Sequence, residues 1–267
     1  MDGLKHNVLG VMVDACDYDV ATERIIDAAA RGHHFAVTAL AVHGVMEGVG
    51  DRSLCRQINS FDLVTPDGQP VRWALNILHG THLKDRVYGP DLAMHVLDGA
   101  CRDRLPVYLY GSTPPTLSRL VTSLRDRFPR LEIAGHEPSK FRGALDGEAE
   151  EIAQRISASG ARILLVGLGC PKQEQFAYAM RPLLFMPVLA VGAAFAYHAG
   201  ELPFPPRWMQ RYGLEWAWRL GLEPKRLWRR YVLTNPAFLA MLGAQKARMW
   251  RANPPPPATD LPSSFAV

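Results

Sequence analysis

Short apolar runs alternate with amphipathic stretches along the first 200 residues of the chain. The apolar runs predict buried strands, and the stretches between them have apolar residues at the three- and four-residue spacing of a helix. The predicted strands are 7–13, 34–38, 61–64, 106–110, 132–136, 162–166 and 187–191. The predicted helices are 20–31, 42–59, 71–78, 92–102, 114–128, 148–157 and 171–180.

This alternation predicts an α/β fold, with a Rossmann-like, mostly parallel sheet and helices on both of its faces. Ligands of such sheets bind beyond the carboxyl ends of the strands, so the loops that follow the strands are where we look for function.

The pattern changes near residue 200, where Pro203, Pro205 and Pro206 interrupt the chain. Short helices are predicted after them, at 207–212, 214–220, 225–233 and 237–250. We therefore expect a catalytic core at 1–200 and a basic, tryptophan-rich helical appendage at 201–252. The proline-rich tail at 253–267 is expected to be disordered.

The chain has 267 residues, enough for one substantial core with a smaller appendage. Its cysteines are scattered without C-x-x-C spacing, which argues against a disulfide scaffold or a zinc site and favours a reducing compartment. They are Cys16, Cys55, Cys101 and Cys170. The amino terminus lacks a signal-peptide pattern. The longest apolar run, 183–197, is broken by Pro187 and Gly192 and is shorter than the roughly 20 residues of a spanning helix. We expect a cytoplasmic protein that does not span a membrane.

Positive charge is concentrated near the carboxyl end. The net charge is +4, yet residues 207–251 contain ten lysines and arginines against two glutamates, together with five of the six tryptophans. Two interpretations remain open. The segment is a solvated basic surface with aromatic core anchors, or it is a surface for anionic lipid or a lipid diphosphate. The chain has no nucleic-acid recognition motif, so we do not expect that partner.

The run Val-Gly-Leu-Gly-Cys-Pro-Lys-Gln-Glu at 166–174 follows a predicted strand. Gly167 and Gly169 allow a tight turn, and a helix is expected to start at the proline that follows. A helix start after a glycine turn exposes N–H groups that hold anions, and here Lys172 and Gln173 come directly after it. We interpret this corner as a binding or catalytic site and expect Gln173 to have little packing duty.

Other strand ends offer further candidates. Asp67, between Pro66 and Gly68, is either ordinary turn chemistry or a carboxylate that accepts a proton from an attacking hydroxyl. Gly111 and Ser112 open a helix and form either a diphosphate cradle or a simple cap.

Three more side chains belong to this set. Thr38 ends an early strand and can face a ligand. Arg86 and Asp91 place a cation and an acid around one turn, although Asp91 also suits a helix cap.

These motifs occur together and in order, which gives the chain a family resemblance. They are Pro-Asp-Gly at 66–68, Arg-Val-Tyr-Gly-Pro-Asp at 86–91, Tyr-Gly-Ser at 110–112, the 166–174 run, Val-Gly-Ala-Ala-Phe at 191–195, Pro-Arg-Trp-Met at 206–209, Gly-Leu-Glu-Trp at 213–216 and Glu-Pro-Lys-Arg-Leu-Trp-Arg-Arg-Tyr at 223–231. Over about residues 7–245 the chain resembles the WecG/TagA/CpsF glycosyltransferases, glycosyltransferase family 26.

The resemblance implies transfer of an N-acetylmannosamine-type sugar from a UDP-sugar to a polyprenyl-diphosphate-linked saccharide, in the synthesis of a surface polysaccharide. It implies inversion at the anomeric carbon, with no metal and no cofactor. In this pattern Asp67 is the general base, and Gln173 and Thr38 belong to the active site. Many members read T-x-N after the early strand, whereas this chain has Thr-Ala-Leu at 38–40.

The resemblance also implies that the basic segment docks at the inner face of the cell membrane and closes over a diphosphate, which Arg207 and Arg211 would hold. Related enzymes suggest self-association, so a homo-oligomer is a possible state. The expected substrate-binding residues are Gly111, Ser112, Gly167, Gly169, Lys172, Arg86, Asp91, Arg207 and Arg211.

Two other functions compete with this one. A nicotinamide-dependent oxidoreductase would need G-x-G-x-x-G after an early strand and an acid about 20 residues later, which the chain lacks. A non-catalytic membrane-associated scaffold would have no need of Asp67 and Gln173.

Overall fold

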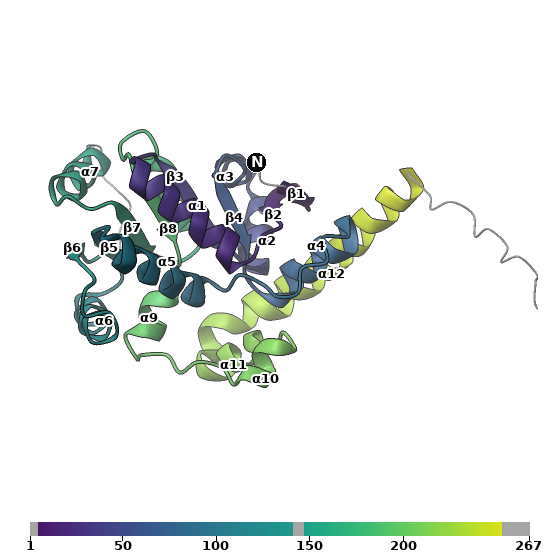
Figure 1. Cartoon of the computed structure of the whole chain (residues 1–267). Helices are drawn as coiled ribbons and strands as arrows, with labels where there is room; N and C mark the ends of the chain where they lie inside the picture. Colours follow the sequence, from purple (N-terminus) through teal and green to yellow (C-terminus); the bar gives the residue numbers. More distant parts are fainter. Residues whose placement is uncertain (1–4, 141–146, 253–267) are drawn as a thin grey trace, which may run out of the picture.

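A parallel sheet of six strands forms the centre of the molecule (Figure 1). The computed structural model describes residues 5–140 and 147–252. The strand order is β4-β3-β8-β7-β5-β6, and every pairing in this sheet is parallel. The strands are β3 (Phe35–Leu40), β4 (Leu63–Pro66), β5 (Val107–Gly111), β6 (Ile133–Glu137), β7 (Ile163–Gly167) and β8 (Pro187–Ala190). The predicted α/β class and parallel sheet are confirmed.

Helices cover both faces of this sheet, as the sequence predicts. One face packs against α1 (Tyr18–Arg31), α5 (Gly89–Asp103), α6 (Pro114–Arg127) and α9 (Ala194–His198). The other packs against α2 (Val42–Gly50), α3 (Arg52–Asn59), α4 (Gln69–His79), α7 (Glu148–Ala158) and α8 (Lys172–Met180). Consecutive strand residues alternate between the two cores: Leu165 belongs to the first and Val166 to the second. Burial on both faces explains why the strands read as continuous apolar runs.

Two local predictions in the core are wrong, and one element was missed. Residues 7–13 are not one strand but part of a hairpin of β1 (Lys5–Val8) and β2 (Val11–Asp14), because Leu9 and Gly10 adopt positive φ and turn the chain. The predicted helix 42–59 is two helices, because the Asp51 carboxylate accepts from the N–H groups of Ser53 and Leu54 and starts α3 there. Helix α9 was not predicted.

The carboxyl-terminal region consists of α10 (Arg207–Arg211), α11 (Glu215–Leu222) and α12 (Pro224–Ala252). The two helices predicted at 225–233 and 237–250 are one, since α12 continues through Pro236. Buried Phe238 and Leu242 anchor α12 in the core, and this packing overrides the helix-breaking signal of the proline. Figure 1 shows α12 running beside α4. The tail predicted at 253–267 lies outside the described residues.

Among residues 5–140 and 147–252, no helix combines the length and the apolar character that crossing a bilayer requires.

Candidate functional site

Two neighbouring cavities lie where the carboxyl-terminal helices meet the core. The smaller, about 110 Å³, is lined by Asp67 and Tyr88 from the core, by Glu215 and Arg219 from α11, and by Tyr231 from α12. The larger, about 510 Å³, shares Gln69 with it. The prediction of a functional edge at the strand ends therefore coincides with a concave, polar part of the surface.

Asp67 follows β4 and is held in place by the neighbouring strand β3. Its N–H donates to the carbonyl of Leu40, which ends β3, at 3.1 Å, so the turn is fixed between two strands. Gly68 has a φ of 93°, a conformation that glycine adopts without strain. Burial raises the pKa of the Asp67 carboxyl to about 7, and the positive charge of Arg86 opposes this rise. A carboxyl group with a pKa near neutrality suits a general base.

The larger cavity is strongly basic. Five cationic side chains line it, against two carboxylates, Asp85 and Asp91. The cations are Arg72, Lys84, Arg86, Arg207 and Arg211. Arg207 and Arg211 are exposed on one short helix, so their guanidinium groups remain available to a ligand. This arrangement fits a doubly charged anion such as a diphosphate, because guanidinium forks match phosphate oxygens.

Thr38 and Gln173 meet at a third group, Glu174. The Thr38 hydroxyl donates to Glu174 Oε1 at 2.9 Å, and Gln173 Nε2 donates to the same oxygen at 3.0 Å. All three side chains are buried, and burial raises the pKa of Glu174. The expectation that Gln173 has little packing duty is wrong, because it supports a buried carboxyl group.

The glycine turns have packing roles. A Cβ on Gly111 would lie 2.7 Å from the carbonyl oxygen of Gly167, and one on Gly167 would lie 2.6 Å from the Phe195 ring. Ser112 has a φ of 61°, and its N–H donates to Gly167 at 2.9 Å. This N–H is therefore engaged within the protein.

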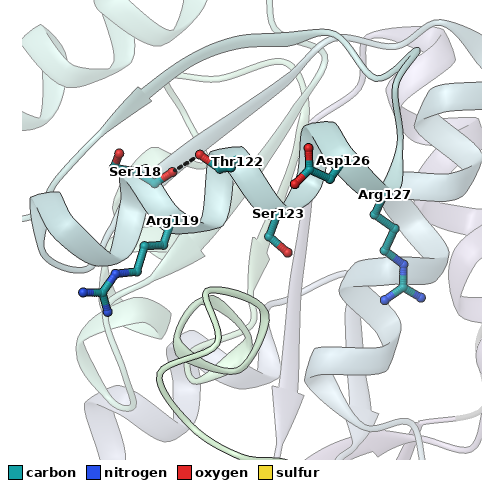
Figure 2. Close-up of a pocket in the computed structure, with 6 residues that line it drawn as sticks. All are labelled: Ser118, Arg119, Thr122, Ser123, Asp126 and Arg127. Carbon is teal, nitrogen blue, oxygen red and sulfur yellow. Dashed lines mark hydrogen bonds between the residues drawn. The ribbon is translucent and has the colours of Figure 1, made fainter.

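A separate hollow of about 580 Å³ follows the outside of α6 (Figure 2). Its six lining residues all come from this one helix, and the Thr122 hydroxyl donates to the carbonyl of Ser118 at 3.1 Å. No buried polar group faces it among its lining residues, which the structure describes in full. We therefore regard the cavities at Asp67 as the better candidate.

The structure brings some of the predicted residues together and separates others. Asp67 lines the smaller cavity, and Arg86, Asp91, Arg207 and Arg211 line the larger one. Thr38 and Gln173 form the buried cluster with Glu174. The remainder lie at the ends of β5 and β7 and are not among the described residues that line either cavity. They are Gly111, Ser112, Gly167, Gly169 and the exposed Lys172.

Sequence reasoning gave no role to three residues that the structure places at or beside the site. Glu215 and Arg219 line the cavity of Asp67, and Glu174 joins Thr38 to Gln173. Glu174 and Glu215 stood inside motifs that we had already singled out, whereas Arg219 lies between two of them. A charged residue between apolar neighbours, as in Gly-Leu-Glu-Trp at 213–216, was the available signal.

Comparison with known proteins identifies the family of this chain. Residues 6–252 match the Glycosyl transferase WecG/TagA/CpsF family. An N-acetylglucosaminyldiphosphoundecaprenol N-acetyl-beta-D-mannosaminyltransferase of Bacillus spizizenii is 30% identical over 191 residues, 71% of this chain and 72% of the relative. A protein of the same name from Bacillus subtilis is 28% identical over 202 residues, 74% of this chain and 75% of the relative. Because the family model matches nearly the whole length of its sequence, the chain belongs to the WecG/TagA/CpsF glycosyltransferase family.

Proposed function

We propose that this protein transfers an N-acetylhexosamine-type sugar, N-acetylmannosamine or a relative, from a UDP-sugar to a polyprenyl-diphosphate-linked saccharide. The names of the two Bacillus relatives support both the sugar and the lipid-linked acceptor. The observation that carries the proposal is Asp67, a carboxylate with a raised pKa in a cavity bordered by cationic side chains.

The proposed reaction is a single displacement with inversion. Asp67 accepts the proton of the acceptor hydroxyl while that oxygen attacks C1 of the donor sugar. The bond between C1 and the UDP oxygen breaks, and UDP leaves with the electron pair. A base with a pKa near 7 is ionised at neutral pH and still holds a proton well enough to take part in this transfer.

Negative charge on the diphosphates needs compensation as UDP leaves. Arg207 and Arg211, with Lys84 and Arg72 beside them, supply it from the larger cavity. Arg219 adds a guanidinium group next to Asp67. Six cationic side chains line the two cavities, and this supports a reaction in which side chains, without a metal ion or a cofactor, compensate the charge of the diphosphate.

A peripheral position at the inner face of the cell membrane is part of the same proposal, because the acceptor is a lipid. Ten of the fifteen large apolar side chains that the structure shows as exposed lie between Phe204 and Met241. Trp208, Tyr212 and Trp228 lie among exposed arginines of the same helices. Such a mixture of aromatic rings and cations suits the headgroup region of an anionic membrane.

The test is release of UDP from a panel of UDP-sugars with a short-chain lipid-diphosphate acceptor. We expect UDP release that depends on the acceptor, and a loss of turnover of roughly 10²–10⁴-fold in Asp67→Asn, the range for a positioned base. Asp126→Asn, on the exposed hollow of α6, is the matched control and keeps full activity.

The outcomes also separate the competing functions. A scaffold releases no UDP with any donor, and an oxidoreductase instead binds a nicotinamide dinucleotide. Near-normal turnover in Asp67→Asn would remove Asp67 as the base.

A further inference from the structure

An ion pair between the core and α11 forms the wall between the two cavities. Arg86 donates through Nη1 and Nη2 to the two carboxylate oxygens of Glu215. Arg86 is only 4% exposed, and its guanidinium group lies 4.3 Å from the centre of the Tyr88 ring. Glu215 is the first residue of α11 and lines the cavity of Asp67. The Glu215 carboxylate, which comes from the carboxyl-terminal helices, thus binds both Nη groups of Arg86, a buried core arginine next to the proposed base.

Arg86 and Glu215 act on Asp67 with opposite signs. After burial, which raises the pKa of Asp67, the largest influence is the charge of Arg86, which lowers it, and the charge of Glu215 then raises it. The pKa of Arg86 is itself raised, against its burial, by the hydrogen bonds of Glu215 and by the charges of Glu215 and Asp67. The guanidinium group therefore has two carboxylates within its field and binds one of them.

The other groups that face Asp67 do not replace Glu215. The N–H of Gly89 and the charge of Arg219 both lower the pKa of Asp67. His43 from α2 and Tyr231 from α12 line the same cavity, and Tyr18 from α1 lies within electrostatic range. Among the described residues that line this cavity, Glu215 and Asp67 are the only carboxylates.

We propose that Glu215 is a positioning residue for the transfer reaction. By holding the guanidinium fork of Arg86, it keeps Asp67 from forming an ion pair with Arg86 and thereby able to accept a proton. The inference rests on the proposed role of Asp67. Glu215 itself contacts neither substrate nor reacting atoms and acts through Arg86.

Removing Glu215 leads to a distinctive result. Without its partner, Arg86 turns its fork to the remaining carboxylate, and a charge-assisted pair with Asp67 forms. Asp67 is then ionised at lower pH, yet it is a weaker base. The value of kcat/KM on the plateau of its pH profile falls. The acid limb, which is the part of the profile where kcat/KM rises as Asp67 ionises, moves to lower pH. A residue with only a structural role lowers the rate at every pH and leaves the limb in place.

The experiment measures kcat/KM against pH with a water-soluble, short-chain acceptor in the full-length protein. In Glu215→Gln we expect the acid limb to move down by roughly 1–3 units, the range for an opposite charge nearby. Glu215→Asp keeps the charge and moves the limb back toward that of the native protein. Glu201→Gln is the matched control, because Glu201 accepts from Thr116 at 2.8 Å and thereby ties the start of the carboxyl-terminal segment to α6, away from Asp67. Its limb stays unchanged.

A second variant covers a failure to fold, since an arginine left alone in a buried position is costly. Arg86→Met with Glu215→Leu replaces the whole pair by apolar groups, a change that is often neutral for stability. Its limb should lie at or above that of the native protein, because the dominant cation is gone. A carbon-13 NMR titration of labelled aspartate, with the Asp67 signal assigned by its loss in Asp67→Asn, reads the same shift without activity.

Two results would overturn the inference: an unmoved limb in Glu215→Gln despite reduced rate, or a limb below the native one in the double variant. Failure of the proposed function looks different: either the native protein releases no UDP, or Asp67→Asn retains its turnover, and neither result depends on the residue at position 215.

Discussion

The raised pKa of Asp67, the proposed base, comes at a cost to the stability of the fold. Burial raises the pKa of its carboxyl from 3.8 to about 7, so the folded protein binds this proton more tightly than the unfolded chain does. Ionising Asp67 therefore destabilises the fold. The penalty begins as the pH rises above the unfolded value and is complete above about pH 7. Asp67→Asn removes it, so the melting temperature of the variant relative to the native protein should rise between pH 4.5 and pH 8. An equal loss of stability at both pH values would contradict the raised pKa.

Gln173 is a second residue for which structure and chemistry are linked. Gln173→Ala leaves the buried Glu174 carboxyl group with one donor fewer, which costs about 1–3 kcal/mol in free energy of unfolding. We expect reduced activity and a lower midpoint of urea denaturation together. Gln175→Ala, an exposed position on the same helix, is the control and should change neither. Reduced activity with an unchanged midpoint would show that Glu174 finds another donor.

At this scale, sequence predicts residue type and place better than it predicts the partner. Asp67 was singled out as a candidate because a Pro-Asp-Gly turn follows a strand, which is a local pattern. The role of Glu215 was not predicted, because its partner Arg86 lies 129 positions away along the chain and no local pattern indicates such an ion pair. The burial of Gln173 was also missed, since helix position alone does not tell which face a neighbouring helix covers.

Among the elements, the ends of β5 and β7 show how closely the backbones approach one another at the carboxyl edge of the sheet. Gly111→Ala places a Cβ 2.7 Å from the Gly167 carbonyl oxygen and forces alanine to a φ of 116°. We expect the free energy of unfolding to fall by about 1–3 kcal/mol. Gly243→Ala is the reverse control: it lies inside α12 with open space around its Cβ, so it should stabilise by about 1 kcal/mol. Equal denaturation midpoints for the two variants would contradict this account of Gly111.

The elements themselves were largely predictable, because strands buried on both faces leave long apolar runs. The errors have specific physical causes. The tight turn at Leu9 and Gly10 lies within an apolar run, so the run was read as one strand. The Asp51 cap lies within a stretch of helical spacing, so that stretch was read as one helix. Pro236 was read as a helix end, although tertiary contacts of Phe238 and Leu242 carry α12 past it.

For the whole molecule, the carboxyl-terminal helices are not a detachable unit. Leu227, Phe238 and Leu242 are buried, and Gln245 donates to the carbonyl oxygen of Asn7 at 3.0 Å. A chain cut near residue 200 would expose core surface, so its failure to bind lipid would carry little meaning. Point substitutions on the exposed surface of these helices are the better test of membrane docking.

Trp208 and Trp228 are the residues to change, because they are 58% and 49% exposed and therefore contribute little to the folded core. The double variant Trp208→Ser/Trp228→Ser should keep its melting temperature and its activity on a water-soluble acceptor. Its partition onto vesicles of anionic phospholipid should fall by about tenfold or more, because inserting a large apolar side chain is worth about 1.5–3 kcal/mol.

Phe185→Ser is the control, since Phe185 is 75% exposed in the loop before β8, at the amino-terminal edge of the sheet. Because the surrounding arginines add an electrostatic part, binding of the native protein should also weaken as salt screens the surface. Unchanged vesicle binding in the double variant, or an equal loss in Phe185→Ser, would mean that these helices do not form the membrane-facing surface.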